Sequence, residues 1–163
     1  MQPTQFQQKR LQFEEENLLE NSDQLPPNCS YKKTGPLAYV VQYVGEKGTP
    51  HEGAHIVVDV DLSGTNGSPG FPAEAPNITF RNGFQHVNVY PMGKLCMYLS
   101  NKETFTSGTT LLEIFQGINQ VIHHPTFHDP ANASILIQEG GKGYDEKMRD
   151  QAKKLSQPQY KVL

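Results

Sequence analysis

The amino-acid sequence predicts an α+β domain in which one helix precedes a small antiparallel sheet and further helices follow it. Three features of the sequence indicate this class. Helix formers dominate residues 5–21, and residues 37–44 and 56–62 are rich in strand formers. A capping-box pattern at residue 110 then opens a long run with helical spacing. Helical segments are therefore expected on both sides of the strands.

The first expected helix covers residues 5–21. Leu11 and Leu18 contribute to a partial apolar stripe along it. The helix should end before Pro26 and Pro27, because proline cannot continue a helix.

The strands form a meander in this reading. Residues 37–44 are apolar and rich in strand formers, and residues 56–62 alternate between apolar and polar side chains, as a half-buried strand requires. Residues 45–53 between them are a turn by their Gly and Pro content. A connection rich in Gly and Pro over residues 64–76 leads to a short strand at residues 77–80.

The second half of the chain is expected to be helical. Thr110 and Glu113 form the capping box of its first helix, which Pro125 closes. The apolar positions on one face of this helix are Leu111, Leu112, Ile114, Phe115, Ile118, Val121 and Ile122.

Two more helices are predicted after it. Asp129 and Pro130 can start one as N-cap and first-turn residue, and it would run to Gln138. The last helix covers residues 144–155, with basic side chains towards its C-terminal end.

Length and charge limit what the chain can be. Its 163 residues fit one domain, residues 1–163, with flexible tails expected at 1–4 and 157–163. The net charge of −3 argues against a broad electrostatic grip on nucleic acid or on a membrane surface. No apolar run is long enough to span a bilayer, and the N-terminus lacks a signal-peptide pattern. Cys29 and Cys96 are therefore expected to be free thiols in an intracellular monomer of the nucleus or cytoplasm.

A polar segment that ends in a thiol lies between the strands and the later helices. It contains His86, Asn88 and Gly93 before Cys96. A thiolate attacks carbonyl carbon, and an amide side chain can stabilise the oxyanion that forms. Core strands prefer alternating apolar residues, so this composition favours a site for acyl-group chemistry.

This order of elements and the residues at its joints resemble the ubiquitin-conjugating enzyme family, over about residues 9–155. Within the family the resemblance is greatest to the SUMO-conjugating type. The resemblance implies the ubiquitin-conjugating fold, with a four-stranded antiparallel meander, a catalytic loop and C-terminal helices. Its anchors are Gly48-Thr-Pro-His-Glu-Gly53, Phe71-Pro72 with Pro76, His86-x-Asn88 with Gly93 and Cys96, Asp129-Pro130, and Gln151-Ala-Lys-Lys154.

The resemblance also implies roles for these residues. Cys96 would receive the modifier's carboxyl terminus from an activating enzyme as a thioester and transfer it to substrate lysines. Asn88 would stabilise the oxyanion or support the loop, while Tyr90 and Asp129 would line the lysine's path and orient or activate it. His86 and Gly93 would be structural. The implied partners are a SUMO-like modifier or ubiquitin, an activating enzyme, ligases and protein substrates, and no metal or cofactor is needed.

Several positions depart from the family pattern. Val87 replaces the proline of the family's His-Pro-Asn, and proline would preset the turn. The first helix carries an acidic stretch at residues 14–20, where the SUMO-conjugating type is basic, and reversed charge would repel an acidic partner surface. Phe105 is expected in place of the family's Trp. The remaining departures are Ala73, Met92, Lys94 and Leu136.

Alternative functions stay open at this stage. The chain can be a ubiquitin-conjugating enzyme proper, a non-catalytic variant of the fold that acts as a binding module, or a cysteine hydrolase that uses Cys96 and His86. His123, His124 and His128 could suggest a metal site, but adjacent histidines on a helix diverge by about 100°, so no metal site is expected.

Overall fold

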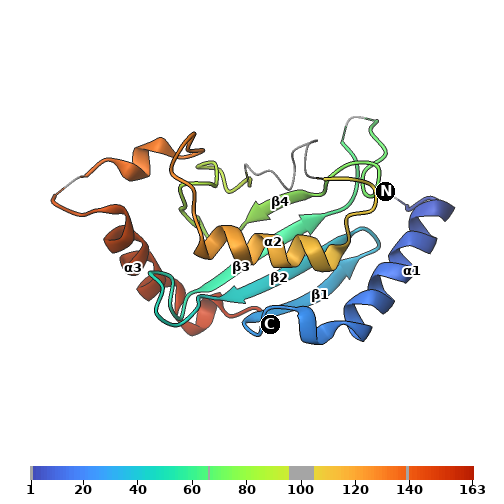
Figure 1. Cartoon of the computed structure of the whole chain (residues 1–163), viewed down its shortest axis with the longest axis horizontal. Coiled ribbons are helices and arrows are strands. Elements are labelled where there is room, and N and C mark those ends of the chain that lie inside the picture. Colours follow the sequence, from blue (N-terminus) through green and yellow to red (C-terminus); the bar gives the residue numbers. More distant parts are fainter. Residues whose placement is uncertain (1, 66, 96–104, 139) are drawn as a thin grey trace.

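The computed structural model describes residues 2–65, 67–95, 105–138 and 140–163, and it confirms the predicted α+β class and the meander. A four-stranded antiparallel sheet has the strand order β1-β2-β3-β4, α2 lies across one of its faces, and α1 and α3 lie at opposite ends of the molecule (Figure 1). The helices are α1 (Gln5–Glu20), α2 (Leu111–His123) and α3 (Tyr144–Leu155), with 3-10 turns η1 (Ser22–Gln24), η3 (Ala133–Leu136) and η4 (Pro158–Tyr160). The strands are β1 (Cys29–Gly35), β2 (Ala38–Val44), β3 (His55–Asp61) and β4 (Asn77–Phe80).

The core lies between the sheet and α2. Inward-facing residues of neighbouring strands are paired across the ladder, so that Val41 of β2 is opposite Val58 of β3, which in turn is opposite Phe80 of β4. The helix face predicted from the spacing of apolar residues in α2 is buried against them. The buried hydroxyl of Tyr43 donates a hydrogen bond to the main-chain oxygen of Phe115 at 2.6 Å, which ties α2 to β2.

The first strand carries no apolar alternation in the sequence. β1 pairs with β2 from Cys29 opposite Tyr43 to Gly35 opposite Ala38. It is an edge strand, and most of its side chains are exposed. An edge strand can remain polar because it buries little of its surface, so pairing with β2 rather than side-chain pattern defines it.

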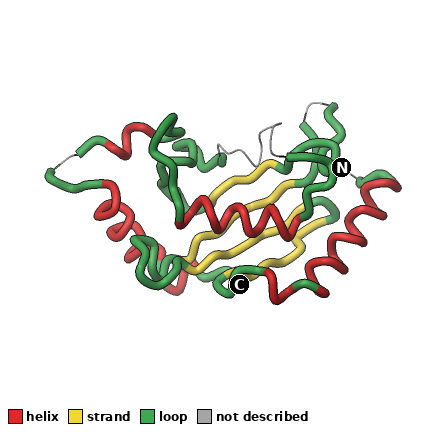
Figure 2. The backbone as a smooth tube through the Cα atoms, viewed as in Figure 1, coloured by secondary structure: helices red, strands yellow, loops and turns green. Residues whose placement is uncertain are grey.

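The prediction of a helix over residues 129–138 is wrong. The structure has only the 3-10 turn η3 in this region, which the trace in Figure 2 shows between two loops. Asp129 has a positive φ of 54°, so it cannot serve as the N-cap of a helix. The main-chain N–H groups of Ala131 and Asn132 donate to the main-chain oxygen of Val87, at 2.9 and 3.1 Å, instead of to a neighbouring turn.

Residues 157–163, which the sequence predicts as a flexible tail, lie against the sheet in this structure. The side chain of Gln42, which is buried in β2, accepts a hydrogen bond from the N–H of Val162 at 2.7 Å and donates one to the oxygen of Leu163 at 3.2 Å. Tyr160 packs against the edge of the core. A buried amide side chain requires hydrogen-bonding partners. Residues 162 and 163 supply them for Gln42, and these bonds hold the end of the chain against β2.

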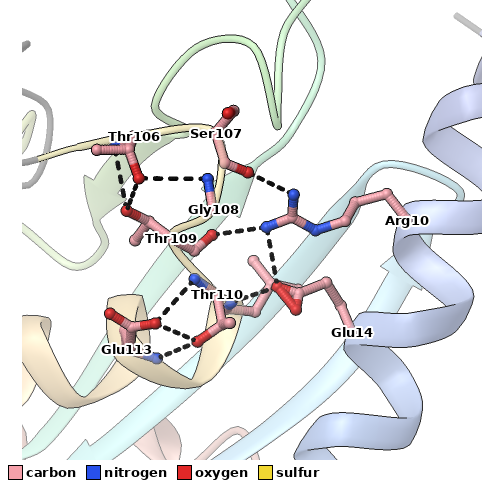
Figure 3. A network of polar contacts seen from close by, with 9 residues as sticks. Arg10, Glu14, Thr106, Ser107, Gly108, Thr109, Thr110 and Glu113 are labelled. Carbon is pink, nitrogen blue, oxygen red and sulfur yellow. Dashed lines mark hydrogen bonds and ion pairs between the residues drawn. The ribbon is translucent and has the colours of Figure 1, made fainter.

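A network of polar contacts joins α1 to the chain that leads into α2 (Figure 3). The carboxylate of Glu14 is fully buried, accepts a hydrogen bond from the N–H of Leu111 at 2.9 Å, and lies 3.6 Å from the guanidinium of Arg10. Arg10 also donates to the main-chain oxygens of Ser107 and Thr109. Burial raises the pKa of Glu14 even though the Leu111 N–H and the charge of Arg10 stabilise its ionised form.

Replacing Glu14 with alanine should lower the free energy of unfolding by about 3 kcal/mol, because it leaves the Leu111 N–H and the charge of Arg10 without their carboxylate. Chemical denaturation at pH 7 measures the loss. Glu16→Ala is the matched control, since Glu16 is exposed and accepts only an exposed contact from the Gln12 amide among the described residues, and its cost should stay below about 1 kcal/mol. Equal losses in the two variants would contradict this role of Glu14.

None of the helices in the described ranges is both long enough and apolar enough to cross a membrane.

Candidate functional site

A tight turn shapes the segment that precedes the thiol. The N–H of Gly93 donates to the oxygen of Tyr90 at 2.8 Å, and the N–H of Tyr90 donates to the oxygen of Lys94 at 2.9 Å. Gly93 has a φ of 99°, a conformation that side chains with a Cβ rarely adopt. The turn leaves Met92 at its tip 80% exposed and Tyr90 41% exposed.

The chain after this turn is bound to the edge of β4. The N–H of Phe80 donates to the oxygen of Gly93 at 2.8 Å, and the N–H of Leu95 donates to the oxygen of Ile78 at 3.0 Å. A Cβ on Gly93 would lie 2.5 Å from the main-chain oxygen of Phe80, so only glycine allows this approach. Cys96 follows Leu95 in the sequence and lies outside the described residues.

His86 is fully buried, and both of its ring nitrogens have hydrogen-bonding partners. Its Nδ1 accepts a hydrogen bond from the N–H of Asn88 at 3.0 Å, so Nε2 carries the proton that it donates to the oxygen of Ile122 at 3.2 Å. Burial lowers the pKa of His86 to about 4. The imidazole is therefore neutral at pH 7 and connects the segment to the end of α2.

The side chain of Asn88 is bonded to Thr126 through both of its polar atoms. Its Nδ2 donates to the main-chain oxygen of Thr126 at 2.8 Å and to the Thr126 hydroxyl at 3.0 Å, and its Oδ1 accepts from the Thr126 N–H at 3.0 Å. Asn88 is 8% exposed. These contacts hold the segment before the thiol against the chain that follows α2.

Asp129 lies on that same following chain. The two residues after Pro130 donate their N–H groups to Val87, so the stretch with Asp129 runs beside the stretch with Asn88. The side chain of Asp129 is exposed. The structure thus brings the Asp129 stretch next to the segment that carries His86, Asn88, Tyr90 and Gly93.

Sequence reasoning did not predict which residues hold this segment in place, and it named Gln151 only as part of the family resemblance. Thr126 binds Asn88, the hydroxyl of Tyr144 accepts the N–H of Val87 at 3.2 Å, and Gln151 binds the main chain of Gln85. Their partners are 38 to 66 positions away in the sequence. No local pattern marks such contacts, and a threonine, a tyrosine and a glutamine are individually ordinary.

The other thiol is of a different kind. Cys29 begins β1, is partly buried against the core, and is a free cysteine. Burial raises the pKa of its thiol to about 12, so Cys29 stays protonated and unreactive at neutral pH.

Phe105 is the residue expected in place of the family's tryptophan. Its ring centroid lies 6.3 Å from that of Phe71.

Among the described residues, no group of three or more histidine, cysteine or acidic side chains is arranged to hold a metal ion.

Comparisons with known proteins agree on one family. The family model described as "Ubiquitin-conjugating enzyme" matches residues 10–154, from within α1 almost to the end of α3. A curated relative, "Probable ubiquitin-conjugating enzyme E2 L460" from Acanthamoeba polyphaga mimivirus, is 24% identical over 115 residues, which cover 69% of this chain and 70% of that protein.

Proposed function

This chain belongs to the ubiquitin-conjugating enzyme family, and from that premise we propose that Cys96 carries the carboxyl terminus of a ubiquitin-like protein as a thioester and passes it to lysines of other proteins. Members of the family are transferases that work with a ubiquitin-like modifier, an activating enzyme and ligases. The thiol, the identity of the modifier and the roles of single residues are the parts of this reading that we propose.

The chemistry consists of two acyl transfers. In the first, the Cys96 thiolate attacks the thioester carbonyl on the activating enzyme, whose own thiolate leaves. In the second, a neutral lysine amine attacks the carbonyl on Cys96, an amide bond forms, the Cys96 thiolate leaves, and the amine gives up a proton. The thioester already holds the energy of activation, so neither step requires a metal or a cofactor.

The observation that carries this proposal is the convergence of two stretches before Cys96. Leu95, the residue next to the thiol, is bound to the edge of β4, and Asn88 is bonded to Thr126 on the stretch that leads to Asp129. The bonding of Asn88 favours support of the loop over direct donation to an oxyanion. We assign Asp129 to orienting or deprotonating the incoming lysine, and Tyr90 to its path.

The contacts of His86 argue against a cysteine hydrolase. A hydrolase needs an imidazole that can take the proton of the thiol. Both nitrogens of His86 are engaged with main-chain groups, and burial lowers the pKa of the ring to about 4. An acyl carrier does not need such an imidazole at its thiol, because the leaving group of each step is a thiolate, which departs without taking up a proton.

For the modifier we propose a SUMO-like protein, with ubiquitin as the alternative. Three motifs support the SUMO type, namely residues 47–53, the spacing from Asn88 to Gly93, and residues 151–154. The acidic stretch of α1 departs from the SUMO-conjugating type, but less strongly than its sequence indicates. Glu14 is buried within the protein, so only its neighbours contribute charge to the surface of α1.

The test is to charge the wild-type protein in parallel with SUMO and with ubiquitin, each with its activating enzyme and ATP. We expect SUMO to give an adduct that thiol reductants remove. Ubiquitin charging alone would keep the enzyme class and overturn the choice of modifier. Failure to charge across a panel of activating enzymes would overturn the carrier function itself.

A further inference from the structure

The main chain at Val87 is held from two sides. Its N–H donates to the hydroxyl of Tyr144, the first residue of α3, at 3.2 Å. Its oxygen accepts from the N–H groups of Ala131 and Asn132. Val87 is fully buried and directly precedes Asn88. A buried N–H without a partner is costly, so the Tyr144 hydroxyl satisfies a group that water does not reach.

The ring of Tyr144 is itself fixed by its neighbours. It packs edge-on against Phe127, with ring centroids 5.3 Å apart, and edge-on against His86 at 6.3 Å. Burial raises the pKa of Tyr144 to about 12, so its hydroxyl stays neutral at pH 7. Because the ring is packed on two sides, the position of its hydroxyl oxygen is fixed. The hydrogen bond to this oxygen in turn orients the N–H of Val87.

A second side chain of α3 binds the same stretch of main chain. The Oε1 of Gln151 accepts from the N–H of Gln85 at 2.6 Å, and its Nε2 donates to the oxygen of Gln85 at 2.9 Å. Residues 144 and 151 are seven positions apart on α3, so they lie on one face of the helix, two turns from each other. Through these two side chains, α3 makes three hydrogen bonds to the main chain from Gln85 to Val87.

We propose that Tyr144 and Gln151 are positioning residues, through which α3 fixes the main chain at 85–87 and thereby the place of Asn88. Val87 makes this necessary. A proline at that position would restrict φ by its ring and would have no N–H to satisfy, whereas valine has an N–H and leaves φ freer. This inference rests on the proposed function, because it assigns the two residues to the lysine-transfer step.

The experiment compares Tyr144→Phe with wild type in two measurements. The first is hydrogen exchange of the Val87 amide by NMR, and the second is the single-turnover rate of transfer from the charged enzyme to free lysine. Phenylalanine keeps the ring and removes the hydroxyl. We expect Val87 exchange to become about fivefold to tenfold faster and transfer to slow by a similar factor. Tyr31→Phe is the matched control, because Tyr31 lies in β1, at the edge of the sheet opposite β4, and it should change neither.

A second background separates positioning from a general effect on the fold. In Val87→Pro the donor is gone, so adding Tyr144→Phe should cause no further loss of transfer rate. An equal loss in both backgrounds would overturn the proposal, and so would unchanged Val87 exchange in Tyr144→Phe. If Val87→Pro does not fold, faster Val87 exchange without slower transfer in Tyr144→Phe would also overturn the proposal. The exchange comparison also stands apart from the carrier function, whose failure would appear as absence of charging in the wild-type protein.

Discussion

Replacing Cys96 with alanine should abolish formation of the modifier adduct, and replacing it with serine should change the chemistry of that adduct. Alanine has no nucleophile. Serine offers a hydroxyl, which is a weaker nucleophile than a thiolate at neutral pH, so charging should be slower and should give an oxygen ester. Gel analysis with and without reductant measures both results, because the ester resists thiols and is cleaved by hydroxide.

The chain supplies its own control for this prediction. Cys29→Ala removes the only other cysteine, whose pKa is raised to about 12 by burial at the start of β1. Adduct formation should be unchanged in this variant. A reductant-sensitive adduct that persists in Cys96→Ala and disappears in Cys29→Ala would show that Cys29 carries the modifier, and it would contradict the role of Cys96.

The parts of the fold that the sequence predicts are those with local causes. The capping box of Thr110 and Glu113 is present in the structure, with the Glu113 N–H donating to the Thr110 hydroxyl at 3.1 Å. The last helix spans Tyr144–Leu155, as its pattern indicates. Each of these features depends on residues within a few positions of one another, so the sequence contains the whole cause.

The parts that it does not predict depend on distant partners. The acidic stretch of the first helix has the sequence of a solvated face. Glu14 is nevertheless buried, and its carboxylate accepts a hydrogen bond from the N–H of Leu111, 97 positions later. Asp129 and Pro130 have the local signature of a helix start. The oxygen of Val87 takes the N–H groups that follow them, and the helix does not form.

The candidate site divides in the same way. His86, Asn88 and Gly93 stand out in the sequence because they interrupt an otherwise apolar pattern. Nothing in the sequence says that Asn88 will be held by Thr126, or that the ring of His86 will bond to Ile122. The residue types indicate a functional site, whereas the contacts that support it arise from tertiary packing.

The same packing brings two further histidine rings close to that of His86. The ring of His51 lies 5.8 Å from that of His86 and 6.1 Å from that of His123. His123 donates from Nδ1 to the oxygen of Asn119 and accepts at Nε2 from the N–H of Glu46, so it too is neutral. The partly exposed carboxylate of Glu46 lies 3.6 Å from Nδ1 of His123, and the two form an ion pair only when the His123 ring is protonated.

These three histidines should make the protein sensitive to acid. Burial lowers the pKa of His51 to about 3 and that of His86 to about 4, and the pKa of His123 is also lowered. Histidines in the unfolded chain take up protons below about pH 6.5, before these buried rings do. The free energy of unfolding therefore falls as pH drops from 6.5 towards 4, by about 1.4 kcal/mol per pH unit for each buried ring. Between pH 7 and pH 5, His51 and His86 together should lower the free energy of unfolding by about 4 kcal/mol.

Urea denaturation at a series of pH values measures this loss, and His51→Phe tests its source. The ring of His51 stacks among aromatic neighbours, and its Nδ1 has no hydrogen-bond partner among the described residues, so phenylalanine can take its place without leaving another group unpaired. The variant should retain more stability at pH 5, since the loss from pH 7 shrinks by about 2 kcal/mol. His128→Gln is the matched control, because that side chain is exposed in the folded protein and its removal should leave the slope unchanged. A slope that His51→Phe does not reduce would contradict the contribution of His51 to the acid sensitivity.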